Sequence, residues 1–350
     1  MASTVTDVEN RLGHYDAALQ ASLDALARQR RAWGDHHPEV ARTLVNVAAL
    51  HSIRGELDAA LRYAEEAVAL AEQSLGPDHP RTADALQALA GVQSKRGDID
   101  AAIAGYERAL AVYDRHQPMQ AEAVRASLGG QLTKQGEHAR AIAMLEQVLE
   151  AQRARLGPDS PELMTVLINL GAARRGGGDL DGAARTYREA LRVGEASLAP
   201  DHPTLAYPLN NLGSIEHAQG RLPEARSLLS RALSIRLAKL GERHPLVAST
   251  LDSLAMVDLD EAQAATAVTR LEQAQAIMRA QGTEPLRRAQ IELHLARALT
   301  AAGREPERAL TLAKASERTF TELHRPDDRR DAEALLVELG PPPRERVTSP

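Results

Sequence analysis

The sequence contains no cysteine and very few aromatic residues. Its 350 residues include one Trp, one Phe and six Tyr, so aromatic side chains make up only 2%. Without cysteine, the chain cannot form a disulfide framework or a thiolate zinc site, and it has no cysteine nucleophile. With so few large rings, the core must be built from Ala and Leu, which favours helices packed at short distances.

Long apolar runs and an excess of positive charge are also missing. No run of about 18 apolar residues exists, and Met1–Asp7 has neither the basic start nor the apolar centre of a signal peptide. The formal net charge is -6, which argues against a general affinity for the phosphate backbone of nucleic acids. We therefore expect a soluble, cytoplasmic protein whose partners are neither nucleic acids nor membranes.

One short motif recurs along the chain. It reads Leu75-Gly76-Pro77-Asp78-His79-Pro80, and versions of it end at the prolines at 38, 80, 161, 203 and 245. The steps between these prolines are 42, 81, 42 and 42 residues, and the step of 81 corresponds to two repeats of which one is shorter by three. A degenerate copy near His116–Met119 marks the shortened repeat. A fixed period of this length indicates a repeat architecture.

A second series of residues divides each period in two. Glycines recur at positions 13, 55, 97, 136, 178 and 220, each between two apolar-periodic segments. Such a glycine suits a left-handed turn at the end of a helix. In the motif itself, Pro77 stops one helix and Pro80 fits the first turn of the next. Each repeat is thus predicted to be a helix, a tight turn, a second helix and a link.

Small residues occupy fixed positions in these predicted helices. A leucine-type column runs Val5, Val47, Leu89, Leu128, Leu170, Leu212, Leu254 and Leu295. From position 48 on, an Ala or Gly follows each member directly: Ala48, Ala90, Gly129, Gly171, Gly213, Ala255 and Ala296. Two further Ala columns run through the second helices, beginning at Ala18 and at Ala25. Small residues in register let helices approach at the short end of the roughly 8–10 Å packing range.

These columns, the turn glycine and the Leu-Gly-x-x-His-Pro link resemble the tetratricopeptide repeat (TPR), of the long, 42-residue kinesin-light-chain-like type. The resemblance covers nearly the whole chain. It departs from the family late in the first helices, where the usual aromatic residue is replaced by His51, Gln93, Leu132, Arg174 and Glu216.

The resemblance implies an all-α fold, a right-handed α-solenoid over residues 1–340 with about eight TPR helix pairs and a C-terminal capping helix. The repeats are expected at about 1–34, 38–76, 80–116, 119–157, 161–199, 203–241, 245–282 and 285–323, the capping helix at 327–339 and a disordered tail at 341–350. Residues before Gly13 hold only the end of a first helix, as in a repeat that has been cut short.

The C-terminal portion, from Leu271 to Ala313, resembles the ends of TPR arrays attached to myxobacterial serine/threonine protein kinases. This implies a regulatory or scaffolding segment in bacterial signalling. A kinase domain itself would need an Asp-Phe-Gly motif, and the only Phe of the sequence is Phe320.

Candidates for catalysis or metal binding are scarce. His37, His79, His202 and His244 recur with the period, but equivalent atoms of stacked helices lie on the order of 10 Å apart. Zinc needs nitrogen ligands at about 2.0–2.1 Å, so we interpret these histidines as residues that order the links. Gly176–Gly178 lacks the preceding strand and the Lys-Ser/Thr of a phosphate loop. No catalytic residue, metal site or cofactor is predicted, and the chain is expected not to be an enzyme.

A binding groove is the remaining candidate, because the resemblance places the first helices along a concave surface. The predicted groove residues are Arg42, Asn46, Gln87, Lys95, Lys134, Asn169, Arg175, Tyr207, Asn210, Asn211 and His217. Asn both donates to and accepts from a peptide backbone, which favours capture of an extended peptide. The alternative is hydrogen bonding between helices of the array.

Two further features leave alternatives open. Gly91, Gly129 and Gly130 lie within helices, where each costs about 1 kcal/mol relative to Ala, so either a neighbouring helix or a ligand approaches closely. The cations near the ends of the first helices, Lys95, Lys134 and Arg175 among them, either bind an acidic ligand or complement the helix dipoles. The Lys of the carboxylate clamp in chaperone-binding TPRs is missing from its column.

The sequence therefore predicts a non-catalytic scaffold that binds a protein or an extended, acidic peptide through the concave TPR groove. The alternative is a regulatory TPR segment of, or partner to, a bacterial serine/threonine kinase system. Self-association is a further expected partner class. Tyr207 is the only aromatic residue in the groove columns, and Pro208 after it predicts a late start or a kink in that helix.

Overall fold

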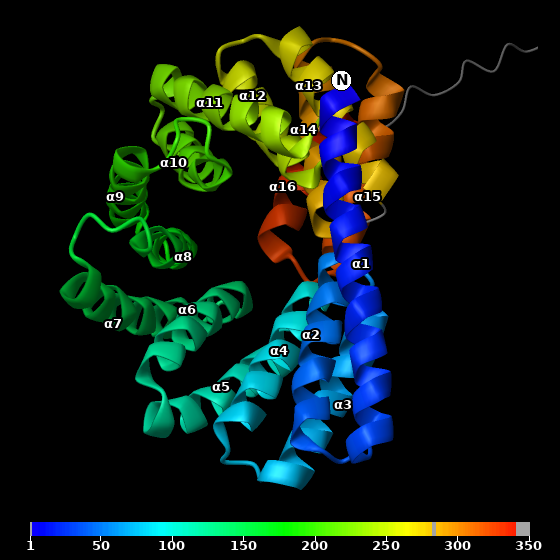
Figure 1. Cartoon of the computed structure of the whole chain (residues 1–350). Coiled ribbons are helices and arrows are strands. Elements are labelled where there is room, and N and C mark those ends of the chain that lie inside the picture. Colours follow the sequence, from blue (N-terminus) through cyan, green and yellow to red (C-terminus); the bar gives the residue numbers. More distant parts are fainter. Residues whose placement is uncertain (1, 282–284, 341–350) are drawn as a thin grey trace, which may run out of the picture. The chain divides into compact units, whose positions relative to one another are not determined.

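The computed structural model describes residues 2–281 and 285–340, and its regular structure in those ranges is entirely helical (Figure 1). The described residues form α1 to α16 and one short 3-10 helix, with no strand among them. The predicted all-α fold of consecutive helix pairs is confirmed. The predicted disordered tail at 341–350 lies outside the described residues. The helices group into two compact units, residues 1–193 and 194–350.

The first unit contains α1 to α8 and most of α9. The helix bounds are α1 (Ala2–Trp33), α2 (Pro38–Ile53), α3 (Leu57–Leu75), α4 (Pro80–Arg96), α5 (Ile99–His116), α6 (Pro118–Gln135), α7 (His138–Leu156), α8 (Leu163–Gly176) and α9 (Leu180–Ser197). From α1 to α8 each helix packs against the next one in the chain. The first helices of neighbouring repeats also touch, α2 with α4 and α6 with α8.

The second unit repeats this arrangement. After the 3-10 helix η1 (Pro203–Leu205) come α10 (Ala206–Ala218), α11 (Leu222–Leu240), α12 (Pro245–Asp260), α13 (Ala264–Gln281), α14 (Pro285–Ala301), α15 (Pro306–Glu322) and α16 (Pro326–Leu339). The α-helix starts at Ala206, three residues after Pro203, which agrees with a late start, but Tyr207 lies within α10 although Pro208 was expected to disfavour helical geometry there. At the far end, α16 buries Ala332 and Leu335 against the core that contains Phe320, so it covers the last helix pair as a cap does.

The glycines between the helices of a pair adopt the left-handed conformation that the sequence predicts. Gly97 has φ 89° and Gly136 has φ 92°, both in the left-handed region. After Gly97, the N–H of Asp98 donates to the carbonyl of Gln93 at 2.9 Å, which satisfies a carbonyl at the helix end. A residue with a Cβ would be strained at these positions.

The periodic histidines cap the helices that follow them. In each case the ring Nδ1 accepts a hydrogen bond from the backbone N–H two residues later, at 3.2 Å for His37, 3.1 Å for His79, 3.3 Å for His202 and 3.1 Å for His244. This is the role that Ser or Asp usually plays at a helix start. In the remaining full-length link, the Ser160 hydroxyl takes the place of the histidine and accepts from the N–H of Glu162 at 3.4 Å. The histidines thus order the links, as predicted, by accepting through Nδ1.

Two further places depart from the regular repeat. The spacing predicts a turn at Gly13, but α1 continues from Ala2 to Trp33 through this position, so the predicted helix pair at 1–34 is a single helix. A glycine alone costs a helix about 1 kcal/mol and does not end it. In the shortened repeat, only Gln117 separates α5 from α6, whereas four residues separate α3 from α4. The three missing residues therefore come from the link, and both helices keep their length.

The small-residue columns lie where helices approach most closely. Within the pairs, a methyl group placed on Gly129 would lie 2.7 Å from Leu145 Cγ, and one on Gly171 would lie 2.6 Å from Tyr187 Cε1. In the second unit, a methyl group on Gly213 would lie 2.7 Å from Leu229 Cγ. All three neighbouring side chains are fully buried and cannot move aside. These glycines are required by the packing of the first helix on the second.

Candidate binding groove

A continuous hollow that includes some of the predicted groove residues lies in the first unit, between α6 and α8. Two adjacent cavities of about 360 and 330 Å³ share Ser127 and Asn169 in their walls, and together they form one groove. We call this the α6–α8 groove. Its lining residues are Tyr106, Ala123, Ala126, Ser127, Gly130, Gln131, Thr133, Lys134, Gln152, Glu162, Thr165, Val166, Asn169 and Ala172.

The floor of the groove is built from small residues of both helices. Ala126 and Gly130 lie one turn apart on α6, and Ala172 lies on α8. Gly130 differs from its neighbour Gly129, because the nearest atom to a methyl group placed on it would be Asn169 Nδ2, at 3.8 Å. That is an ordinary contact, so helix packing does not require glycine at position 130. The missing side chain instead enlarges the groove.

Asn169 crosses the groove and joins its two helices. Its Nδ2 donates to the carbonyl of Ala126 at 3.2 Å. Hydrogen bonding between helices, one of the two alternatives for the asparagines, therefore applies to the Nδ2 of this residue. Its Oδ1 has no hydrogen-bond partner among the described residues and lies in the wall of the groove, where it can accept from a ligand.

Hydroxyl groups add further acceptors along α6. The Ser127 hydroxyl donates to the carbonyl of Ala123 at 3.1 Å, and the Thr133 hydroxyl donates to that of Gly129 at 2.8 Å. Both residues line the groove, and each hydroxyl oxygen can still accept a hydrogen bond. Tyr106 reaches the same wall from α5, and burial raises the pKa of its hydroxyl, so this group is neutral at physiological pH. The groove thus offers neutral polar groups to a ligand, and its floor consists of small residues.

Lys134 supplies the positive charge of the groove. The residue is exposed, and its Nζ donates to Gln131 Oε1 at 3.5 Å. Lys95 on α4 donates to the Ser52 hydroxyl at 2.9 Å and likewise has no carboxylate partner among the described ion pairs. Both lysines differ from the arginines in the last turns of the first helices. Those arginines are held by acidic residues: Arg54 by Asp16 and Glu56, Arg96 by Asp58 and Asp98, and Arg174 by Glu146.

The other predicted residues of the first unit do not line the α6–α8 groove. Arg42 is exposed and pairs with Glu39 at 2.7 Å, while Asn46 is exposed on α2. Gln87 is half-buried on α4, with its Oε1 at 3.2 Å from the Tyr113 hydroxyl. Arg175 is exposed at the end of α8 and is already engaged within the protein.

The predicted residues of the second unit are divided between surface and interior. Tyr207 is 43% exposed, whereas Asn210 is only 8% exposed, and its Oδ1 accepts from Arg236 Nη1 at 3.0 Å. Asn210 was expected in the groove, but the buried guanidinium beside it draws its side chain into the interior. The ring Nε2 of His217 lies 2.8 Å from Asp260 Oδ2, and Asn211 is half-buried with an interaction of its own.

No role for Arg236 was predicted from the sequence, although comparing equivalent positions of the repeats would have pointed to it. Positions 71, 113, 152, 194, 236 and 278 follow the repeat period through the second helices, and they carry Ala71, Tyr113, Gln152, Gly194, Arg236 and Met278. Ala71, Tyr113 and Met278 are buried. An arginine in a column of buried residues is unusual and could have been noticed from the sequence alone.

Comparison with known proteins agrees with this architecture. The tetratricopeptide repeat profile matches residues 5–73, 40–115, 120–196 and 198–280, which is most of the chain. No curated protein gives a significant match to the sequence. In the described residues, no helix has both the length and the apolar character needed to cross a membrane.

Solved structures with the same arrangement include proteins of different roles. The apo form of the quorum sensor NprR from B. thuringiensis aligns with a TM-score of 0.62 at 15% identity, over 95% of this chain and 99% of that chain. BtubC (BKLC) from P. vanneervenii aligns with a TM-score of 0.54 at 21% identity, over 65% of this chain and 92% of that chain. A putative kinesin light chain with TPR-like repeats from Podosopora anserina gives a TM-score of 0.49 at 22% identity, over 58% and 97%.

At these identities, the NprR and BtubC structures share a fold with this chain and establish no common ligand. The family assignment rests on the repeat profile, which covers well over half of the residues, and on the helix pairs with their turn glycines and capped links. The chain belongs to the tetratricopeptide repeat family.

Proposed function

We propose that this protein is a non-catalytic scaffold that binds a protein or an extended peptide, and that the α6–α8 groove is its binding site. Membership of the tetratricopeptide repeat family supports an interaction role in general. The groove adds a place for the partner, with a floor of small residues and polar groups on both walls.

Gly130 is the observation that carries this proposal. A glycine within a helix lowers its stability by about 1 kcal/mol relative to Ala, so it needs a reason. For Gly129, Gly171 and Gly213 the reason is a buried side chain in contact. For Gly130 the space above the residue is the groove itself, which is what close approach of a ligand backbone requires.

The groove suits an extended segment of acidic character. Asn169 Oδ1 and the hydroxyls of Ser127 and Thr133 can accept from backbone N–H groups, as an extended chain presents them in a row. Lys134 stands at one end of this row without a carboxylate partner among the described ion pairs, so an acidic side chain of the ligand can pair with it. An exposed pair of this kind contributes up to about 1 kcal/mol, and we expect it to add specificity more than affinity.

The experiment is a screen of immobilised peptides followed by titration of the best acidic sequence. We expect binding that weakens about tenfold when Gly130→Val fills the groove, and that weakens less, by about threefold, in Lys134→Glu. The matched control is Lys314→Glu, which makes the same change of charge on α15 outside the groove. Equal affinity of the Gly130→Val variant and the wild type would contradict the proposal.

A regulatory role in kinase signalling is the second candidate, favoured by the C-terminal resemblance at Leu271–Ala313. It predicts that the chain, added in trans, changes the activity of a bacterial serine/threonine kinase domain. Self-association and a cytoplasmic location are further parts of the proposal. Sedimentation of the purified chain tests the first, and fractionation of cells tests the second.

A further inference from the structure

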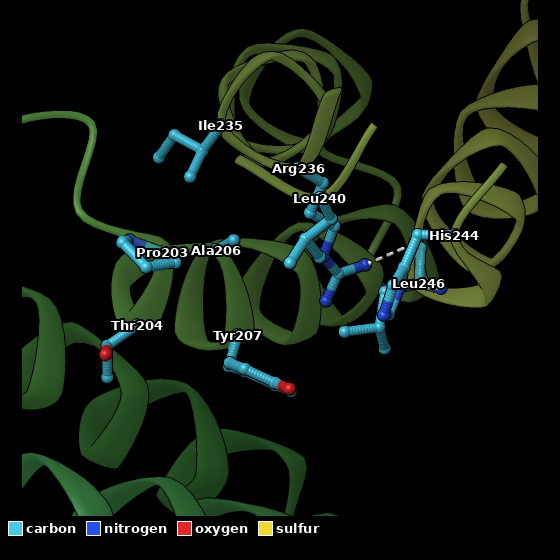
Figure 2. A pocket seen from close by; sticks show the side chains of 9 residues that line it. All are labelled: Pro203, Thr204, Ala206, Tyr207, Ile235, Arg236, Leu240, His244 and Leu246. Carbon is cyan, nitrogen blue, oxygen red and sulfur yellow. Dashed lines mark hydrogen bonds between the residues drawn. The ribbon is translucent and has the colours of Figure 1, made fainter. Parts of the chain in front are cut away.

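A second, smaller cavity lies in the second unit, where the start of α10, the end of α11 and the start of α12 meet (Figure 2). Its volume is about 190 Å³, and its wall includes Thr204, Tyr207, Leu240, His244 and Leu246, with Arg236 beside them. Figure 2 shows the Arg236 side chain reaching from α11 toward the start of α12. These residues belong to other helices than the α6–α8 groove, so the cavity requires its own explanation.

Arg236 is buried but only partly satisfied. The residue is 3% exposed, and its Nη1 donates to Asn210 Oδ1 at 3.0 Å, to the carbonyl of Leu246 at 2.9 Å and to the Thr250 hydroxyl. All of these bonds fall on one nitrogen. The Nε is buried without a hydrogen-bond partner, and Nη2 makes no hydrogen bond to the described residues. The edge formed by Nε and Nη2 is the one that can hold a carboxylate with two parallel bonds.

The charge of Arg236 is not neutralised by the protein. The acceptors on Nη1 are an amide, a carbonyl and a hydroxyl, all of them neutral, and no described ion pair includes this residue. Burial lowers the pKa of Arg236 to about 10, and the positive charge of Arg287 on α14 acts in the same direction. The Tyr207 ring, 5.6 Å from the guanidinium carbon to its centroid, offers a cation–π contact in return. A buried cation without a counter-ion is costly, and an anion that enters the cavity would remove this cost.

The size and lining of the cavity limit what the anion can be. Its volume is below the roughly 300–1,000 Å³ of sites that hold whole small molecules, so it fits one functional group and a short stem. Leu240 and Leu246 present apolar surface to such a stem. Tyr207, a lining residue at 43% exposure, connects the cavity with the surface. A carboxylate on one or two carbons meets these conditions.

We propose that this cavity binds a single carboxylate of a partner peptide, with Arg236 as its counter-ion. The carboxylate belongs either to an Asp or Glu side chain or to the C-terminus of the peptide. This site goes beyond the groove proposed above, because it uses a different unit and different residues. An experiment can therefore contradict the proposal for one site without contradicting the proposal for the other.

The test follows the Nε–Hε signal of Arg236 by NMR in the full chain labelled with ¹⁵N-arginine. The signal is assigned by its absence in Arg236→Lys. Acetyl-glutamate amide supplies a side-chain carboxylate, acetyl-leucine supplies a terminal one, and acetyl-glutamine amide is the neutral control. We expect a saturable shift with the first or the second probe, which identifies the source, and no shift with the neutral control.

A variant that fills the cavity from within keeps the proposal testable if Arg236→Lys does not fold. Leu240→Glu places a carboxylate at the cavity, and we expect it to weaken probe binding at least about tenfold. Leu237→Glu is the matched control, because Leu237 lies on the same helix outside the cavity and is 38% exposed, compared with 37% for Leu240. We expect it to bind the probe as the wild type does.

Three results would overturn the proposal. The first is an Arg236 signal that stays constant with both carboxylate probes. The second is a signal that shifts equally with the neutral control or shifts only with inorganic phosphate. The third is equal weakening by Leu240→Glu and Leu237→Glu, which would trace the effect to surface charge instead of the cavity.

Discussion

Two adjacent glycines of α6 offer a direct comparison between packing and binding. Gly129 faces α7 and meets Leu145, whereas Gly130 faces the α6–α8 groove and meets only Asn169 Nδ2 at 3.8 Å. The same substitution, glycine to alanine, adds one methyl group in either case. Because the helix is the same and the positions are neighbours, the change in intrinsic helix propensity is the same. Any difference in stability must come from what the methyl group meets.

The expected magnitudes have opposite signs. Gly130→Ala gains about 1 kcal/mol of helix propensity and clashes with nothing, so we expect it to stabilise the protein by about this amount. Gly129→Ala has the same gain, but its methyl group would lie between 2.7 and 3.1 Å from three atoms of Leu145, which is fully buried. Overpacking of this kind costs about 1–3 kcal/mol, and at the upper end the net loss is about 2 kcal/mol.

Urea unfolding followed by circular dichroism measures both variants against the wild type. Repeat arrays can unfold in stages, so the comparison is made on the transition that contains α6, identified by hydrogen exchange. A control adds Leu145→Val to Gly129→Ala, which removes a methylene group at the clash and should restore part of the loss. The reasoning is refuted if Gly130→Ala destabilises the protein or if Gly129→Ala stabilises it.

Two further predictions concern the turns and the links. Gly97→Ala places a Cβ on a residue with φ 89°, so we expect the free energy of unfolding in urea to fall by about 1 kcal/mol. Gly91→Ala is the control, because its added methyl group would lie 3.7 Å from Tyr106 Oη, and we expect it to cause no loss. The pKa of His244 is lowered by burial and then by the charge of Arg236, so the folded state favours the neutral ring that caps α12. The stability that the neutral His244 ring gives the folded state is complete above the unfolded pKa of about 6.5. It is lost as the pH falls through the lower pKa of the folded state. We expect His244→Ala to cost about 1 kcal/mol of unfolding free energy at neutral pH. We expect His244→Ser to keep the cap, because a serine hydroxyl is a good acceptor at a helix start, and to make stability vary less between neutral and acidic pH. A His244→Ser variant as acid-sensitive as the wild type would contradict this account.

Much of the fold was predictable because the period fixes where helices begin and end. The links predicted helix starts at Pro80 and Pro245, and α4 and α12 begin at these residues. A proline restricts its own backbone whatever surrounds it, so its effect can be read locally. Gly13 shows the limit of such reasoning, because a glycine permits a turn without imposing one.

The candidate site was less predictable, because each polar residue of the first helices depends on its partner in the second helices. Gln87 and Asn210 occupy the same column of the repeat, yet Gln87 is half-buried beside Tyr113 and Asn210 is buried beside Arg236. The resemblance predicted which face these residues occupy. It did not predict that Tyr113 and Arg236 in the second helices would be their partners.

The glycines and the link histidines show which features of the sequence predict a structural role. Gly129 belongs to the small-residue column of the sequence and Gly130 does not, and the distances to Leu145 and Asn169 show that only Gly129 is required by helix packing. For the link histidines, the sequence held a clue to their role, because Ser160 takes the same position in one link and its hydroxyl accepts from a backbone N–H two residues later, as the histidine rings do. Positions at which one repeat differs from the others therefore say more about the role of a residue than positions that are the same in every repeat.

The most direct test of the central claim is the affinity of the selected acidic peptide for the wild type and for Gly130→Val. Binding in the α6–α8 groove predicts about a tenfold loss of affinity in the variant, with the fold intact by circular dichroism and with Lys314→Glu unchanged. Equal affinity of the wild type and Gly130→Val for that peptide would show that the partner binds elsewhere on the chain.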